Sequence, residues 1–315
     1  MEEAQKMQAP EAVKQTGGNK VVLYGLAVLQ SIVWGFSFLG TKTALAVLTP
    51  IEIVAIRWTI AAAILILLVA CGILKINLKK ENLKTLIGAA MLQPCVYSIC
   101  EAYGVSLTTT SESSILVAMG PVVVVLLSVV FLKEKIGIAS IGAIVLAFVG
   151  VVTAISMNES FSLGGKFLGY LIMGIGVVTC SLFTIASNRL SGTFAPMEIT
   201  FVMTVQGSIF FNAIVFLFGR GPSIYRICFS DFKTAAAVLF LGLGCTFFCY
   251  MVFNLVVAKL PAHVASALQL NLVTLTGVLS GILCNGDPWN IFTVIGLAIM
   301  LTGIVLSNRA QREIG

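Results

Sequence analysis

The chain has 315 residues, of which 58% are hydrophobic and only 10% are charged, and its mean hydropathy is +1.05. Water-soluble domains carry about 25% charged residues, so this composition excludes an ordinary soluble protein and indicates that a lipid bilayer is the solvent. The formal net charge of +6 arises from basic residues at the ends of apolar runs, which is typical of membrane topology rather than of a nucleic-acid partner.

Ten apolar stretches follow one another along the chain, and a spanning helix needs about 20 such residues. Strand-type alternation is absent, and only helices or closed barrels cross a membrane. The sequence therefore predicts an all-α membrane protein with ten transmembrane helices, a disordered cytoplasmic tail at 1–19 and a second cytoplasmic tail at 309–315. The stretches run near residues 21–47, 51–74, 83–105, 113–132, 137–156, 167–188, 197–218, 235–258, 263–284 and 290–307.

The distribution of Lys and Arg predicts the orientation of the chain. With the N-terminus inside, the segments that face the cytoplasm hold thirteen of these residues, and the outer segments hold four. Such an excess marks the cytoplasmic side. We therefore expect a multi-pass protein of the cytoplasmic (cell) membrane with both termini in the cytoplasm.

The two halves of the chain resemble each other, with a first repeat predicted at residues 20–157 and a second at 163–308. Each repeat contains five apolar stretches, and because five is odd the second copy enters the membrane upside down. Inverted repeats of this kind are typical of secondary transporters, whose substrate site lies at the repeat interface. Offsets of 146 and then 153 residues align Tyr24 with Tyr170, Pro50 with Pro196, Glu52 with Glu198, Tyr97 with Tyr250, and Glu101 with Asn254.

Four segments of the first half carry recognisable motifs, namely Ser31-Ile32-Val33-Trp34-Gly35-Phe36-Ser37-Phe38, Pro50-Ile51-Glu52-Ile53-Val54-Ala55-Ile56-Arg57, Tyr103-Gly104-Val105 and Leu132-Lys133-Glu134-Lys135. These segments resemble the EamA-type transporters of the drug/metabolite transporter superfamily. The likeness extends over about residues 20–307.

This resemblance implies ten helices in two inverted five-helix repeats, a central cavity and alternating access. It also implies that the substrates are small metabolites, most often amino acids or related compounds, and that they are frequently exported. The second repeat departs from the first at two cations, because Asn188 stands where the first repeat has Lys42, and Met203 stands where it has Arg57.

Glu101 is the sharpest candidate for function. An ionisable side chain within a span costs about 2.5–3.5 kcal/mol on insertion scales, so it needs a partner or a role. Tyr97 lies one turn before it on the same helical face. Facing a wet cavity, Glu101 would bind substrate and exchange a proton. The alternative is that Glu101 simply reaches water at the outer end of its helix.

Aromatic rings and amides supply the remaining candidates for substrate binding. Trp34, Tyr97 and Tyr250 lie on helices expected to line the cavity, where rings stack on apolar or cationic groups, although ordinary packing explains any single ring. Asn254, the repeat partner of Glu101, and Asn271 are amides within spans. Such amides either join helices to one another or present fixed hydrogen-bonding groups to a substrate.

Two charged residues on the second apolar stretch have structural interpretations. Glu52 follows Pro50 at a helix start, where a carboxylate complements the helix dipole. Arg57 lies deep enough in the span to need a carbonyl or carboxylate partner. We therefore predict that both residues are structural charges.

Motifs for other functions are missing from the sequence. It contains no phosphate-binding GxxxxGK[ST] motif, no HExxH motif and no visible catalytic triad. We therefore expect no enzyme activity, no cofactor and no metal, and a secondary transporter that exports a small metabolite, with the bilayer and protons as its further partners. Two alternatives remain open, a proton-coupled importer of a cationic compound such as a quaternary ammonium, and a non-transporting membrane receptor. Monomer and homodimer are equally open.

Overall fold

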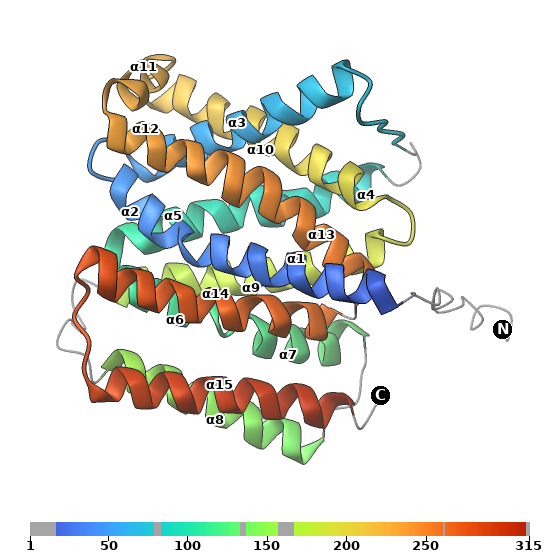
Figure 1. Cartoon of the computed structure of the whole chain (residues 1–315), viewed down its shortest axis with the longest axis vertical. Helices are drawn as coiled ribbons and strands as arrows, with labels where there is room; N and C mark the ends of the chain where they lie inside the picture. Colours follow the sequence, from blue (N-terminus) through green and yellow to red (C-terminus); the bar gives the residue numbers. More distant parts are fainter. Residues whose placement is uncertain (1–16, 79–82, 133–136, 157–166, 261, 313–315) are drawn as a thin grey trace, which may run out of the picture.

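The computed structural model describes residues 17–78, 83–132, 137–156, 167–260 and 262–312 (Figure 1). Within these ranges the protein is built of helices and short connections and has no strand. The helices are α1 (Gly17–Gly35), α2 (Ser37–Ala44), α3 (Pro50–Ala70), α4 (Leu83–Ala90), η3 (Met91–Tyr97), α5 (Ser98–Leu107), α6 (Thr110–Val117), α7 (Gly120–Leu132), α8 (Ile138–Ser156), α9 (Phe167–Leu190), α10 (Pro196–Phe218), α11 (Ser223–Ser230), α12 (Phe232–Leu239), η4 (Phe240–Phe248), α13 (Cys249–Lys259), α14 (Ala262–Asn285) and α15 (Ile291–Arg312).

The apolar helices confirm a multi-pass, all-α membrane protein. Within the described ranges, eight helical segments have the length and hydropathy of a membrane span, and two shorter apolar stretches follow them. Each of the ten coincides with one predicted stretch, and the number ten of membrane spans stays a prediction. The eight are Val21–Ala44, Pro50–Ala70, Leu83–Leu107, Thr110–Phe131, Ile138–Ser156, Phe167–Leu190, Pro196–Phe218 and Phe232–Lys259, and the two are Gln269–Asn285 and Ile291–Ser307.

The predicted tails and the boundary between the repeats fall mostly outside the described residues. Helix α1 begins at Gly17, inside the tail predicted at 1–19, and α15 continues to Arg312, inside the tail predicted at 309–315. The first turn of α1 and the last turn of α15 lie at the same end of the bundle (Figure 1).

Local sequence explains where the central helices begin. Pro50 opens α3, and the Glu52 carboxylate accepts a hydrogen bond of 2.8 Å from the backbone N–H of Thr49. Proline suits the first helical turn because its missing N–H would have no partner there, and a glutamate three residues after the cap satisfies a free backbone donor. Pro196 and Glu198 repeat this arrangement at the start of α10.

Two π-helical segments interrupt spans in the two halves of the chain. In the first half, η3 contains Pro94 and leads into α5, and in the second half, η4 leads into α13. A proline lacks the N–H that would continue the regular ladder, and π-helical turns often occur at functional sites. The helices that follow, α5 and α13, both contribute to the central cavity described below.

Helices α8 and α15 form a separate, closely packed pair at one side of the bundle (Figure 1). A Cβ atom on Gly150 would lie 2.3 Å from the backbone nitrogen of Met300, and one on Gly296 would lie 2.4 Å from that of Ala154. Only glycine permits such a close approach of two helix backbones in a membrane. This pair is therefore held by backbone packing, whereas the central helices meet through larger and more polar side chains.

Candidate functional site

A buried ion pair joins α3 to α5 near the middle of the bundle. The Nη1 atom of Arg57 lies 3.2 Å from Oε2 of Glu101, and the two side chains are only 3% and 6% exposed. An unpaired charge in such a place is costly, and removing one partner of a buried pair commonly costs about 3–5 kcal/mol. The pairing therefore explains how both ions are tolerated within the membrane.

A cavity of about 30 Å³ lies against this ion pair. That space holds about one or two water molecules, so the cavity has no room for a metabolite in the described conformation. Helices from both halves of the chain form its walls. The polar residues that line it are Ser37, Arg57, Gln93, Glu101, Thr184 and Ser266, and the aromatic residues are Trp34, Phe38, Tyr97, Tyr250 and Phe253.

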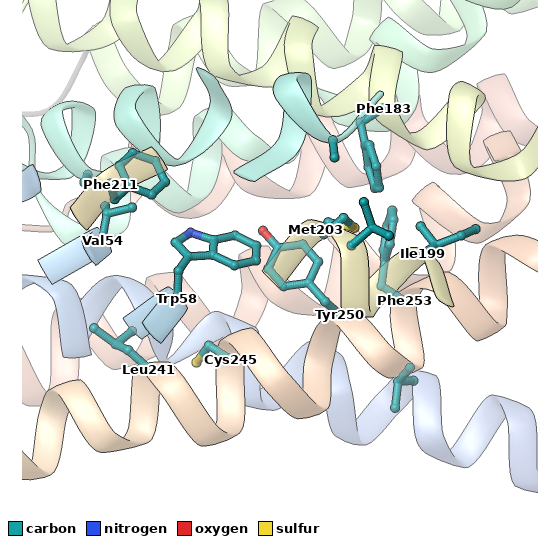
Figure 2. Close-up of a cluster of buried hydrophobic side chains, with 14 of the residues drawn as sticks. Val54, Trp58, Phe183, Ile199, Met203, Phe211, Leu241, Cys245, Tyr250 and Phe253 are labelled. Carbon is teal, nitrogen blue, oxygen red and sulfur yellow. The ribbon is translucent and has the colours of Figure 1, made fainter. Parts of the chain in front are cut away.

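The aromatic wall of the cavity is itself tightly organised. The ring of Tyr250 lies 5.2 Å from that of Trp34 in an edge-on arrangement and 5.2 Å from that of Trp58 in a stacked one. Figure 2 shows Trp58, Tyr250 and Phe253 in the buried cluster that contains part of this wall. Trp34 is further held by a 2.9 Å hydrogen bond from its Nε1 to the carbonyl of Cys245. Rings fixed in this way present a rigid apolar surface.

Three buried polar atoms on the cavity walls have unused hydrogen-bonding capacity. Among the described residues, Nε of Arg57, Oε1 of Gln93 and Oε2 of Glu101 have no hydrogen-bond partner. The Gln93 amide is otherwise fixed, because its Nε2 donates to the hydroxyl of Tyr250 at 2.6 Å. Leaving a buried polar group unsatisfied costs about 1–3 kcal/mol. Within the described ranges, the cavity walls therefore carry a cationic donor and an amide acceptor without hydrogen bonds, beside a carboxylate oxygen whose one close partner is the guanidinium of Arg57.

Four of the six residues predicted to bind substrate line this cavity, namely Trp34, Tyr97, Glu101 and Tyr250. Glu101 is buried, so the alternative in which it reaches water at a helix end does not describe this conformation. Arg57, predicted as a structural charge, is the ionic partner of Glu101 and also lines the cavity.

Asn254 and Asn271, also predicted to bind substrate, lie outside the cavity lining. The Asn254 amide accepts from Ser187 Oγ and donates to Thr200 Oγ1, both at 2.9 Å, so it joins α13 to α9 and α10. In the described conformation this side chain therefore joins helices to one another, which is the other role expected of such an amide. Asn271 is half-buried on α14, and its Oδ1 has no hydrogen-bond partner among the described residues.

The second predicted structural charge, Glu52, lies at one end of α3. Besides accepting from Thr49, its carboxylate is bound through both oxygens by the guanidinium of Arg220, whose Nε lies 2.6 Å from Oε1. The hydrogen bond to Glu52 raises the pKa of Arg220 above its ordinary value. This contact links the start of α3 to the connection that follows α10.

Sequence reasoning missed Gln93, although a signal was present. Gln93, Tyr97 and Glu101 follow one another at intervals of four residues, which predicts one helical face. Cys180 and Thr184 on α9 show the same interval and also line the cavity.

Comparisons with known proteins agree with this architecture. The model of the EamA-like transporter family matches residues 22–156 and again residues 167–309. An uncharacterized transporter of Bacillus subtilis (strain 168), YcxC, is 25% identical over 292 residues, which cover 90% of this chain and 92% of the relative. An uncharacterized transporter of Archaeoglobus fulgidus is also 25% identical, over 88% of this chain and 95% of its own length.

A solved crystal structure superposes with a TM-score of 0.68 at 16% identity, covering 93% of this chain and 98% of the other. At that identity the likeness shows a common fold alone.

Proposed function

The chain belongs to the EamA-like transporter family, and from this premise we propose that it exports a small zwitterionic metabolite, an amino acid or a related compound. The coarser part of this statement is already established. The helices are those of a multi-pass membrane protein, and the relatives are named as transporters, so the chain is a membrane transporter and not an enzyme.

The observation that carries the proposed substrate class is the ion pair of Arg57 and Glu101 on the cavity wall. In a cavity of low dielectric, a ligand with a single charge would neutralise one of these ions and leave the other without a partner, at a cost of several kcal/mol. A zwitterion avoids this penalty, because its carboxylate pairs with Arg57 while its ammonium group pairs with Glu101.

The unused hydrogen-bonding atoms support the same assignment. Nε of Arg57 matches a carboxylate acceptor, Oε1 of Gln93 matches an N–H donor of an ammonium group, and Oε2 of Glu101, which faces Arg57 in the ion pair, would turn to that ammonium group when the substrate carboxylate takes Arg57. The rings of Trp34 and Tyr250 would then pack against the remainder of the substrate. Aromatic rings also suit a quaternary ammonium ion, but the guanidinium of Arg57 on the same wall opposes a ligand with only positive charge.

Transport would proceed by alternating access between two inverted five-helix repeats, ten helices in all. The two matches to the family model, one in each half of the chain, support this organisation. Because the cavity of about 30 Å³ is too small for a metabolite, we infer that the described conformation must widen, toward one side and then the other, before a substrate can pass. A substrate moves this equilibrium only by binding one conformation more tightly than another.

Glu101 remains the proposed site of proton coupling. A proton on its carboxylate would remove the attraction that holds Arg57, so protonation and the opening of the ion pair would be linked. The Glu101→Gln variant tests this step, since a neutral amide of similar shape cannot carry the proton. Transport that keeps its full dependence on a pH gradient in this variant would contradict the assignment.

The experiment for the proposed function measures flux into proteoliposomes of matched ligands, with and without an imposed pH gradient. Each set contains a zwitterionic amino acid, its methyl ester as the cation and its N-acetyl derivative as the anion, together with choline. We expect protein-dependent flux of the zwitterion that exceeds flux of either singly charged derivative. Preferential flux of the ester or of choline would replace this proposal with the cation importer. Binding of the zwitterion without flux would favour a receptor.

A further inference from the structure

An apolar groove lies outside the central cavity, at the end of the bundle that the Lys and Arg distribution predicts to be cytoplasmic. Its volume is about 370 Å³, and it lies where η3, α7 and α9 approach one another. The apolar residues that line it include Leu92, Phe131, Leu182, Ile185 and Leu190.

The groove lies on the face of α9 that points away from the substrate cavity. Leu182, Arg189 and Thr193 line the groove, whereas Cys180 and Thr184 line the cavity. Positions 182, 186 and 189 are separated by four and three residues, which places them on one side of α9, and Thr193 follows just beyond the end of that helix. Because α9 is long and apolar enough to cross a membrane, we expect this groove to face lipid.

The charge at this groove is positive. Arg189 is exposed, and apart from a long 3.4 Å contact between its Nη2 and the carbonyl of Phe131 its guanidinium is free to bind a ligand. Lys84 is also exposed and directly precedes Thr85, which lines the groove. Among the described residues, the lining includes no carboxylate. A headgroup bound here would therefore meet cationic and hydroxyl groups together.

We propose that this groove binds one anionic phospholipid, with an acyl chain along the apolar wall and the phosphate at Arg189. Three features select this occupant over a peptide or a free metabolite. The groove lies on the outer side of a helix that is long and apolar enough to span a membrane, its lining is apolar along most of its length, and the guanidinium of Arg189 lies at the end of α9, where a headgroup would be. Guanidinium groups bind phosphate oxygens through paired hydrogen bonds, and basic pockets between helices on the cytoplasmic side recognise anionic headgroups.

The binding of lipid to the purified full-length protein tests this proposal without any transport assay. Phosphatidylglycerol and phosphatidylcholine with identical acyl chains are titrated into detergent-solubilised protein, and bound lipid is counted by native mass spectrometry. We expect phosphatidylglycerol to bind more tightly, and Arg189→Gln to weaken it about fivefold, which corresponds to about 1 kcal/mol per basic residue. Binding of phosphatidylcholine should not change.

Two further variants keep the test decisive. Lys259→Gln removes one positive charge from the same predicted side, at an exposed position on α13 outside the groove, and should leave binding unchanged. Ala186→Leu fills the groove while Arg189 remains, and should reduce the number of phosphatidylglycerol molecules retained. Equal binding of both lipids, or an equal loss in Arg189→Gln and Lys259→Gln, would overturn the proposal in favour of unspecific surface charge.

Discussion

In each half of the molecule, the side chains at two equivalent positions of the repeat contact each other, but the pair is charged in the first half and neutral in the second. In the first half, Arg57 and Glu101 form an ion pair across 3.2 Å. The repeat offsets place Met203 and Asn254 at the corresponding positions of the second half, where the Asn254 amide donates to the Met203 sulfur at 3.6 Å. The contact between α3 and α5 thus has a counterpart between α10 and α13, but the residues that form the second contact are uncharged. The comparison indicates that the charged groups of the cavity belong to the first half of this transporter.

The two pairs also differ in how completely their hydrogen bonds are used. Both ends of the Asn254 amide are bound to protein groups, through Ser187 on one side and Thr200 on the other. Arg57 and Glu101 each keep a buried atom without a hydrogen bond among the described residues. A saturated pair stabilises helix packing, whereas an unsaturated one beside a cavity is suited to a ligand.

The largest effect is expected when the charged pair is broken. Glu101→Gln leaves the Arg57 guanidinium buried without a counter-ion, which should lower the free energy of unfolding by about 3–5 kcal/mol and abolish flux of the zwitterion. The double variant Arg57→Met/Glu101→Asn gives the first half the neutral pair of the second. Thermal unfolding in detergent and proteoliposome flux measure the two consequences separately.

We expect the double variant to recover most of the lost stability but none of the flux, because it removes both ions together. Recovery of stability would show that the charge, rather than altered packing, caused the loss in Glu101→Gln. Flux of the zwitterion at the rate of the unmodified protein in the double variant would refute the role of this pair in binding.

The helices and part of the site could be predicted from the sequence, for physical reasons that can be named. Apolar length alone predicts a spanning helix, and Pro50 and Pro196 mark helix starts through strictly local chemistry. Glu101 stood out because an ionisable group within a span is costly wherever it packs. The partner of Glu101 was not predictable in the same way, because the proximity of Arg57 depends on how α3 and α5 pack.

The prediction that Asn254 binds substrate depends on the alignment of the two repeats, which does not account for the different side chains at equivalent positions. Its alignment with Glu101 suggested a shared role in binding substrate, but a short neutral amide finds partners on neighbouring helices at little cost. The Arg220–Glu52 contact lay beyond sequence reasoning for another reason, since 168 residues separate its members. Contacts of this kind arise from the tertiary fold and leave no local pattern.

A smaller effect is expected when the neutral pair is disturbed. Asn254→Ala leaves the hydroxyl of Ser187 buried without its partner, which should cost about 1–3 kcal/mol of stability. Because Asn254 lies outside the cavity lining, the KM of the zwitterion should change less than twofold. A variant that unfolds at the normal temperature but has a strongly raised KM would mean that Asn254 contacts substrate in another conformation, and the contrast between the halves would then fail.

The smallest effect concerns the ends of the two equivalent helices α3 and α10. Glu52 caps α3 and binds the guanidinium of Arg220, whereas Glu198 caps α10 and accepts a 2.9 Å hydrogen bond from the backbone N–H of Asn77. Arg220 is 42% exposed, so its loss in Arg220→Gln should lower the free energy of unfolding by about 1 kcal/mol or less. High salt should reduce the difference between this variant and the unmodified protein.

Glu198→Gln is the matched variant at the other end, because it removes a carboxylate that binds no cation among the described residues. Its single amide oxygen replaces two carboxylate oxygens that accept from Asn77 and Ala195, so one hydrogen bond and the interaction with the helix dipole are lost, and the effect on thermal unfolding should depend on salt less than that of Arg220→Gln. Equal salt dependence of the two variants would show that the Arg220–Glu52 contact is screened by solvent and contributes nothing specific. If only Arg220→Gln loses stability in a salt-dependent way, the contrast between the halves extends from the cavity to the helix ends. The carboxylate that binds a cation there is Glu52, which lies on α3, the helix that also carries Arg57.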